Sequence, residues 1–305
     1  MEHPDWSGII PAVLTHFNED FTINFEETLS HIEYLLNNDI SGMIALGTCG
    51  ENNSLEDDEK IDLLKAIVKL VDGRVPVIAG VSELTTARAV TYTKNAVAAG
   101  VNGLMVLPAM AYTSCPRETV AHFQAVADAS PSTPIMVYNC PQAYRVDMNI
   151  PILRELAKID SVVSVKESSG DTRRITDLYN EFGDRFRILA GLDDNAFEAL
   201  CLGVSGWISG TVAAFPKEDH AIYTLCQEGR YAEALEIYRW YTPLLHMDAV
   251  PKLVQLIKLC CVEVGIGNGI CRPPRLDIVG EELEESLKII RHAIATRPDL
   301  SKYGL

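Results

Sequence analysis

Eight short apolar runs, separated by longer stretches of helical pattern, limit the fold of this chain more than any other feature. The runs are rich in Val, Ile, Leu and Met, and most end in Gly, Pro, Thr or Asn, which is typical of buried strands. Strands that alternate with helices favour a parallel sheet covered by those helices. The runs span residues 8–15, 42–48, 75–81, 103–108, 134–139, 162–167, 187–191 and 206–210.

The stretches between the runs have the period of amphipathic helices. Within residues 60–71 the apolar side chains recur at helical spacing: Ile61, Leu64, Ile67, Val68 and Val71. Ser54 and Asp57 resemble the capping box that begins a helix. Eight such strand–helix units predict an α/β fold of the (β/α)8 TIM-barrel type. An open doubly wound sheet is the alternative, but no G-x-G-x-x-G follows the first run, which argues against its dinucleotide-binding version.

The C-terminal part of the chain has a different pattern. It contains three helical stretches, at 231–245, 252–264 and 281–295, and no further strand-like run. We therefore expect a catalytic barrel over residues 1–228 and a C-terminal helical region, residues 229–305, packed on the barrel.

Charge and composition exclude several classes of function. The formal net charge of −16 argues against nucleic-acid binding, which needs basic patches for phosphates. No apolar run is long enough to cross a bilayer, and the first residues lack the pattern of a signal peptide. The eight cysteines form no C-x-x-C pair and the seven histidines do not cluster. We expect a cytoplasmic protein with reduced thiols, no metal, no cofactor, and no nucleic-acid or membrane partner.

The sixth run carries a lysine, Lys166, one residue before its end. Successive strand side chains alternate between faces, so Val162, Ser164 and Lys166 would point into the barrel while Val163 and Val165 face the helices. Barrel enzymes work at the C-terminal ends of their strands. Burial favours a neutral amine, which can attack a carbonyl or imine carbon and form a Schiff base. The alternative is a lysine that pairs with a buried carboxylate or extends to the rim.

Four further residues at strand ends are candidates for chemistry. Tyr138 ends the fifth run, where a phenol can move protons during imine formation or simply fill the barrel mouth. Gly47 and Thr48 begin a turn whose amides and hydroxyl can bind a carboxylate, although Gly-rich turns are common after strands. Cys49 has no histidine near it in sequence, which favours a packed thiol over a nucleophile.

Five motifs together resemble the dihydrodipicolinate synthase / N-acetylneuraminate lyase superfamily. They occur in the family's order and spacing across nearly the whole chain: GTCGE at 47–51, VYNCP at 137–141, VKESSG at 165–170, AGLDD at 190–194 and the pattern G-x-x-G-W-I-S-G at 203–210. The resemblance implies a (β/α)8 barrel with C-terminal helices, usually as a homotetramer built as a dimer of dimers. It also implies class I Schiff-base chemistry on a small 2-oxo acid.

The resemblance assigns roles residue by residue. It maps the Schiff-base lysine onto Lys166, the proton-shuttling tyrosine onto Tyr138 and a carboxylate-binding hydroxyl onto Thr48. Gly191 and Ile208 fall where the family lines its 2-oxo-acid pocket. We also expect Gly47, Cys49, Met110 and Tyr144 to contact the substrate.

The chain departs from the synthases of this family at three positions. Cys49 replaces the family's second threonine, and Met110 stands where a tyrosine reaches the neighbouring subunit's site. Ala143 occupies the position of an arginine that holds the second substrate's carboxylate, and Arg145 lies two residues later. The synthase's hydroxyl relay would therefore lack two of its three members.

A subgroup of the superfamily is more similar. GEN-x-SL at 50–55, PAM-x-Y at 108–112, YRWY-x-PLLH at 238–246 and KLVQ-x-IKL at 252–259 resemble the branch that contains Δ1-pyrroline-4-hydroxy-2-carboxylate deaminase of hydroxyproline catabolism. Its substrate is a cyclic imino acid, and its products are 2-oxoglutarate semialdehyde and ammonia. Candidate general acids for the departing hydroxyl are Tyr144, Tyr112 and Glu51. The alternatives are a pyruvate-dependent aldolase or 4-hydroxy-tetrahydrodipicolinate synthase of the same superfamily, and a non-catalytic 2-oxo-acid binding protein.

Overall fold

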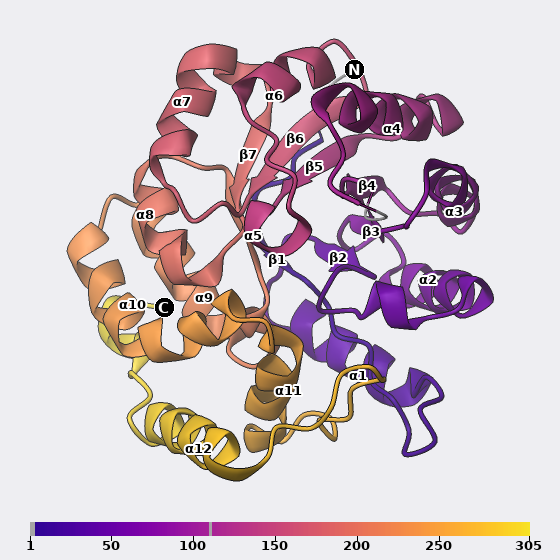
Figure 1. The fold of residues 1–305 in the computed structure, drawn as a ribbon. Coiled ribbons are helices and arrows are strands. Elements are labelled where there is room, and N and C mark those ends of the chain that lie inside the picture. The colour runs from indigo at the N-terminus through magenta and orange to yellow at the C-terminus, as the bar shows by residue number, and fades with distance from the viewer. Residues whose placement is uncertain (1–3, 110–111) are drawn as a thin grey trace.

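A ring of parallel strands lies at the centre of the computed structural model, which describes residues 4–109 and 112–305 (Figure 1). In the described residues the strands are β1 (Gly8–Pro11), β2 (Met43–Ala45), β3 (Val77–Val81), β4 (Gly103–Val106), β5 (Ile135–Asn139), β6 (Val162–Glu167), β7 (Arg187–Ala190) and β8 (Gly206–Ser209). Each strand pairs with its neighbour in the order β1-β8-β7-β6-β5-β4-β3-β2. A parallel bridge between Ala12 and Ile44 joins β1 to β2 and closes the ring. The predicted (β/α)8 barrel is confirmed.

Helices surround this ring on its outer side, as Figure 1 shows. The helices that follow the strands in sequence are α1 (Phe25–Leu36), α2 (Asp57–Val71), α3 (Thr86–Ala98), α4 (Pro116–Ala129), α5 (Pro141–Tyr144), α6 (Ile150–Leu156), α7 (Arg173–Phe182), α8 (Ala196–Cys201) and α9 (Pro216–Gln227). The short 3-10 turns between the elements are η1 (Asn52–Ser54), η2 (Gly183–Arg185), η3 (Asp193–Asn195) and η4 (Thr211–Ala213). In Figure 1, α5 lies over the centre of the ring.

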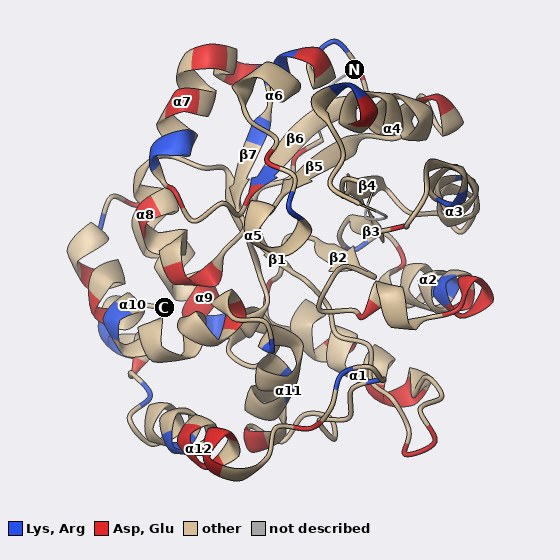
Figure 2. Cartoon of the chain, viewed as in Figure 1, with Lys and Arg blue, Asp and Glu red and all other residues tan. Residues whose placement is uncertain are grey.

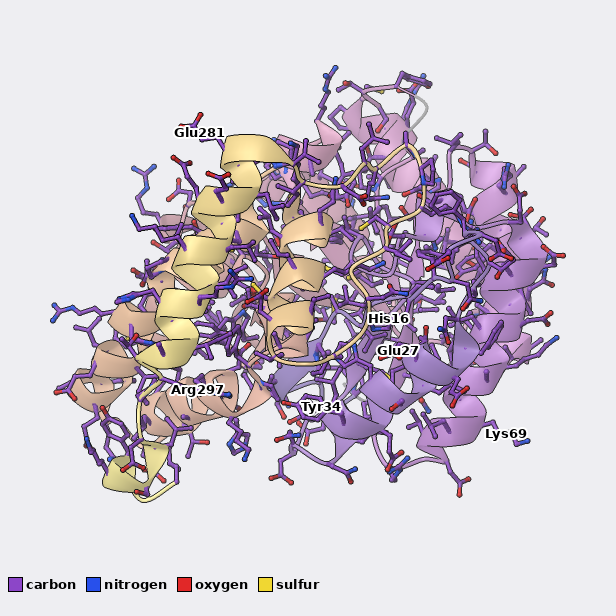
Figure 3. The ribbon with its side chains drawn as sticks, turned by 90° about the horizontal axis from the view of Figure 1, so that it is seen from below. His16, Glu27, Tyr34, Lys69, Glu281 and Arg297 are labelled. Carbon is purple, nitrogen blue, oxygen red and sulfur yellow. The ribbon has the colours of Figure 1, made fainter. Side chains whose placement is uncertain are left out.

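The chain after α9 is helical, as expected. It contains α10 (Tyr231–Leu245), η5 (His246–Ala249), α11 (Leu253–Glu263), α12 (Gly280–Ala295) and η6 (Leu300–Tyr303). Helix α10 packs on α8 and α9, and α12 packs on α10 and α11. Figure 3 shows α12 along one flank, with Glu281 near its first turn and Arg297 just beyond its last. Arg297 forms an ion pair with the buried Glu218 of α9, which ties the C-terminal segment to the barrel. The division of the chain after residue 228 stays a prediction.

Two apolar layers hold the barrel together. The inner layer fills the ring with Ile10, Ile44, Ile78, Met105 and Met136, among others. The outer layer lies between the strands and the surrounding helices. Burial of both faces explains why the strands read as continuous apolar runs in the sequence.

One irregularity in β6 corrects the predicted faces. Ile135 pairs with Val162 but Met136 pairs with Ser164, so Val163 is an extra residue in this ladder. Val163 packs in the inner layer and Val162 in the outer one, which is the reverse of the prediction. Lys166 lies beyond the irregularity, and its side chain points into the barrel as predicted.

The predicted start of α2 was wrong by two residues. Ser54 belongs to η1, and the capping box is made by Glu56 and Glu59. The backbone N–H of Glu56 donates to Glu59 Oε2 at 2.9 Å. Acidic residues at this end also interact favourably with the helix dipole.

Charge is spread over the outside of the molecule. Figure 2 shows Asp and Glu on outer helices all round the ring and not in one patch. In the described part of the chain, no helix is both long enough and apolar enough to span a membrane.

Candidate active site

A cavity of about 770 Å3 opens at the C-terminal ends of the strands. The sequence analysis named nine site residues, and the eight that the structure describes all line this cavity: Gly47, Thr48, Cys49, Tyr138, Tyr144, Lys166, Gly191 and Ile208. The ninth, Met110, lies outside the described residues. The location is that of active sites in barrel enzymes. The roles assigned to these residues stay predictions.

Lys166 is the buried amine of the cavity. Its side chain is 6% exposed, and its Nζ lies 4.1 Å from the centroid of the Tyr138 ring. The two residues are directly paired between β5 and β6. Lys166 makes no salt bridge with any carboxylate in residues 4–109 and 112–305. The amine therefore faces the cavity and an aromatic ring, and no paired carboxylate covers it.

Gly191 makes room for the lysine stem. A Cβ at this position would lie 2.7 Å from Lys166 Cγ and 2.9 Å from Lys166 Cε, which is closer than carbon atoms can approach. It would also lie 2.1 Å from Ser168 Oγ. A larger residue at 191 would push Lys166 out of its position, so the glycine is needed for space.

Three residues with hydroxyl groups, Thr48, Tyr138 and Tyr144, line the same cavity as the amine. Tyr144 comes from α5, and its hydroxyl forms a 2.5 Å hydrogen bond with Thr48 Oγ1. The Tyr138 and Tyr144 rings meet edge to face with centroids 5.5 Å apart. Burial raises the pKa of Tyr144 to about 12, although the Thr48 hydrogen bond opposes the shift, and burial also raises the pKa of Tyr138. Both phenols are therefore protonated at neutral pH and able to donate.

The turn that presents Thr48 is anchored by Glu51. This residue adopts a left-handed backbone conformation with φ of 54°. Its buried carboxylate accepts hydrogen bonds from Lys258 Nζ at 2.7 Å and from the backbone N–H of Arg272 at 3.0 Å. Arg275 lies 3.5 Å away. Glu51 is held by these cations and amides, so it serves the shape of the turn and is not available as the general acid that the sequence analysis considered.

Among the remaining candidates from the sequence, Ala143 lines the cavity, whereas Tyr112 and Arg145 are not among the described residues that line it. Tyr112 is 64% exposed, and its hydroxyl donates to Glu118 at 3.0 Å. Ala143 and Arg145 are exposed, and Arg145 ends α5 in a left-handed conformation with φ of 59°. No arginine in the described ranges lines the cavity. Arg145 therefore does not replace the arginine that the synthases of this family have at the position of Ala143.

Cys49 behaves as a packed thiol. It is 5% exposed, and burial raises the pKa of its thiol. A protonated thiol is a weak nucleophile, which agrees with the interpretation made from sequence. Within the described ranges, no three His, Cys, Asp or Glu side chains gather as a metal ion would require.

Several residues that line the cavity were missed by the sequence analysis, and Asp248 is one that carries an acidic side chain. Asp248 lies in η5, just after α10, and lines the cavity together with Lys166 and Tyr138. The region around it was interpreted only as helices that cover the barrel. The motif at 238–246, which ends two residues before Asp248, was the available signal, but its position over the barrel mouth depends on tertiary structure.

Comparison with known proteins agrees with this geometry. The sequence model of the dihydrodipicolinate synthetase family matches residues 5–293. The chain belongs to this family. Family membership makes it an enzyme, a class I aldolase-type lyase, and confirms the superfamily resemblance seen in the five motifs.

Individual relatives cover almost the entire chain. A 4-hydroxy-tetrahydrodipicolinate synthase from Oceanobacillus iheyensis is 29% identical over 287 residues, which are 94% of this chain and 97% of the relative. The enzyme of the same name from Staphylococcus carnosus is 32% identical over 92% of this chain and 96% of its own. The crystal structure of a dihydrodipicolinate synthase from Bacillus anthracis aligns with a TM-score of 0.90 and 26% identity, over 96% of this chain and 99% of that one.

Proposed function

We propose that this lyase acts on a 2-oxo-acid-type substrate through Lys166, and that the substrate is Δ1-pyrroline-4-hydroxy-2-carboxylate. The observation that carries the choice of substrate is the lining of the cavity. It offers one buried amine, several hydroxyls and no arginine in the described residues. A substrate with a single carboxylate needs no second cationic clamp. The cyclic imino acid has one carboxylate, whereas a synthase must hold an additional acidic substrate.

The chemistry begins at the imine carbon. The Lys166 amine attacks this carbon, the ring opens by exchange, and the substrate becomes a protonated Schiff base with a free amine at its far end. The positive charge acidifies the adjacent carbon, from which a proton is lost. The Tyr138 ring lies beside the amine, and we assign the movement of protons in these steps to its hydroxyl. Elimination of the 4-hydroxyl, migration of the double bonds and hydrolysis then release ammonia and 2-oxoglutarate semialdehyde.

Thr48 and the turn that carries it suit the substrate carboxylate. The Thr48 hydroxyl lines the cavity, and the adjacent backbone of Gly47 and Cys49 lines it too. Hydroxyl and amide donors of a turn can hold a carboxylate without a full positive charge. The anchoring of Glu51 by Lys258 keeps this turn in place.

The second candidate is 4-hydroxy-tetrahydrodipicolinate synthase, and two observations favour it. Relatives that cover more than nine-tenths of this chain carry that name. In addition, Tyr144 gives Thr48 a phenolic partner from the same chain, which can replace the hydroxyl expected from a neighbouring subunit. The missing hydroxyls of the synthase relay are therefore a weaker argument against the synthase than the sequence suggested. The missing arginine at position 143 still argues against it.

The test is ammonia release from Δ1-pyrroline-4-hydroxy-2-carboxylate by the purified protein, with Lys166→Ala as the matched control. We expect ammonia with wild type and none with the folded variant. If wild type releases no ammonia but condenses pyruvate with aspartate semialdehyde, the deaminase proposal is wrong and the synthase takes its place. Borohydride trapping with a panel of 2-oxo acids identifies the Schiff base in either case.

The assembly and location of the enzyme are also proposals. We infer a homotetramer, a dimer of dimers, as the superfamily resemblance implies, and a location in the cytoplasm, as expected from the unpaired cysteines. Sedimentation of the purified protein tests the assembly, and a monomer at micromolar concentration would contradict it.

A further inference from the structure

The cavity contains a carboxyl group that the sequence did not reveal. Asp248 reaches the barrel mouth from η5, so the C-terminal region supplies an acidic group to the cavity. Gly210, at the end of β8, makes the approach possible. A Cβ at Gly210 would lie 2.6 Å from Asp248 Oδ1, so a side chain there would displace the carboxyl.

Asp248 faces a second aspartate, Asp193 of η3, and the two have unequal surroundings. Asp193 Oδ1 accepts a hydrogen bond from Trp207 Nε1 at 2.8 Å. Asp193 Oδ2 accepts from the backbone N–H of Thr211 at 2.8 Å and from Thr211 Oγ1 at 2.6 Å. It also accepts from Ser209 Oγ and the backbone N–H of Gly210. Burial raises the pKa of Asp193, but these donors oppose the shift by stabilising the ionised form, and Asp248 has no comparable set of donors among the described residues. We therefore assign the negative charge of the pair to Asp193.

The same asymmetry keeps a proton on Asp248. Burial raises the pKa of Asp248 well above its usual range, and the negative charge of Asp193 raises it further. The nearby Lys166 cation opposes the shift, as does the backbone amide of Asp193. A carboxylic acid kept neutral beside a fixed carboxylate is an arrangement that suits proton donation near neutral pH.

We propose that Asp248 is the general acid that protonates the hydroxyl leaving from the 4-position of the substrate. This inference rests on the proposed deaminase function. After Lys166 has formed the Schiff base and the adjacent carbon has lost its proton, the enamine electron pair expels the 4-hydroxyl. The carbon–oxygen bond breaks, the Asp248 proton passes to the departing oxygen, and water and the Asp248 carboxylate are formed. Asp248 recovers its proton from the water that next attacks the amine-bearing carbon.

The other candidates suit this step less well. Tyr144 has its hydroxyl bonded to Thr48, and its pKa of about 12 makes it a weak donor at neutral pH. Glu51 is held by Lys258, and Tyr112 is bonded to Glu118 at the surface. Asp248 shares the cavity with Lys166, and within the described residues no hydroxyl or cation donates a hydrogen bond to its carboxyl group.

The test compares Asp248→Asn with wild type on two substrates. Asparagine has nearly the same size as aspartate and keeps an oxygen that can accept a hydrogen bond from the backbone N–H of Asp193, but it has no acidic proton. Asp184→Asn is the matched control, since Asp184 is an exposed aspartate of η2 at the opposite end of the barrel. One substrate carries the 4-hydroxyl, and the other carries fluorine there, which leaves as a stable anion and needs little help from an acid.

We expect Asp248→Asn to slow ammonia release from the hydroxyl substrate by ~10²-fold or more, the scale of one acid–base group. The fluoro analogue should lose less than ~10-fold by the same reasoning. Borohydride trapping of the Schiff base should match wild type, and Asp184→Asn should be unchanged throughout.

Three results would overturn the inference. Equal slowing with both substrates, or loss of trapping, would mean that Asp248 holds the site together and does not protonate the leaving group. Unchanged ammonia release by Asp248→Asn would remove it from the reaction while the deaminase function stands. If wild type releases no ammonia, the proposed function fails and this role of Asp248 fails with it.

Discussion

Two buried lysines of this protein, Lys166 in β6 and Lys258 in α11, differ in what faces their charge. Lys258 is 1% exposed, and its Nζ lies 2.7 Å from Glu51 Oε1 and 2.7 Å from the carbonyl oxygen of Ile270. Lys166 is almost as buried, but in the described part of the chain it forms no such pair. Both amines lie over an aromatic ring, Phe17 for Lys258 and Tyr138 for Lys166. The two lysines therefore differ in having or lacking a paired carboxylate, and they do not differ in having an aromatic neighbour.

The difference separates a lysine used for structure from a lysine available for chemistry. A buried charge is tolerated when a carboxylate and a carbonyl oxygen compensate for lost water. Lys258 has both, and it links α11 to the turn that carries Thr48. Lys60 of α2 is a second structural case, since its Nζ lies 2.6 Å from the buried Glu83. Lys166 has a cavity in place of a partner, so a substrate can reach its amine.

The largest expected effect is on activity. Lys166→Ala should reduce turnover below detection, because no other buried amine lines the cavity among the described residues. The variant should remain folded, since it loses no ion pair. Steady-state assays together with circular dichroism measure both. Normal turnover in a folded Lys166→Ala protein would remove the Schiff-base mechanism.

The converse substitution sharpens the comparison through stability. Lys258→Met removes the cation closest to the buried Glu51 carboxylate and leaves it with Arg275 at 3.5 Å, and breaking such a pair costs about 3–5 kcal/mol of unfolding free energy. Urea unfolding of Lys258→Met and Lys166→Met measures the contrast. We expect Lys166→Met to lie within about 1 kcal/mol of wild type, because a methionine of similar shape replaces an unpaired amine. Equal destabilisation by the two substitutions would contradict the distinction.

The phenol beside Lys166 has a smaller predicted effect. Tyr138→Phe keeps the ring under the amine but removes the hydroxyl, so imine formation should slow by ~10²-fold or more. Stopped-flow measurement of Schiff-base formation separates this step from later ones. The matched control is Tyr92→Phe, which removes the hydroxyl of another buried tyrosine, in α3 and away from the cavity. Wild-type rates in Tyr138→Phe would assign proton movement to another group.

The smallest effect concerns pH and the surroundings of Lys258. His16 is buried next to His31, with 2.9 Å between His16 Nε2 and His31 Nδ1. Figure 3 shows His16 close to Glu27, beneath the loop that precedes α12. Burial, together with the charges of His31 and Lys258, lowers the pKa of His16 from 6.5 to about 3. The folded protein therefore keeps His16 neutral at pH values where the unfolded chain binds a proton.

The sign of the pH effect follows from this difference. Below pH 6.5 the His16 imidazole binds a proton in the unfolded state but not in the folded state. The unfolding free energy therefore falls as the pH drops from 6.5 toward 3. One such group contributes a slope approaching about 1.4 kcal/mol per pH unit. Urea unfolding across this range should give a shallower slope for His16→Gln than for wild type. Identical slopes would mean that His16 is protonated in the folded protein.

Much of the fold and of the site could be predicted from the sequence because the signals are local. Eight apolar runs and the helices between them indicated the barrel, and all eight described site residues proposed from the motifs line one cavity. The errors came where a neighbouring element decides the outcome. The extra residue Val163 reverses the faces at the start of β6 because of its pairing with β5, and the capping box of α2 forms at Glu56, although Ser54 is a common capping residue.

The sequence by itself determined the order of strands and helices, the lysine at the end of the sixth strand and the family to which the chain belongs. These follow from hydrophobic period and from motifs of a few adjacent residues. Only the tertiary structure decided which buried lysine has a partner and that Asp248 reaches the barrel mouth. Glu51 and Lys258 are 207 residues apart in the chain, and Asp248 meets Lys166 through the packing of α10 on the barrel. Charge pairs and cavities depend on distances in space, which a linear pattern does not contain.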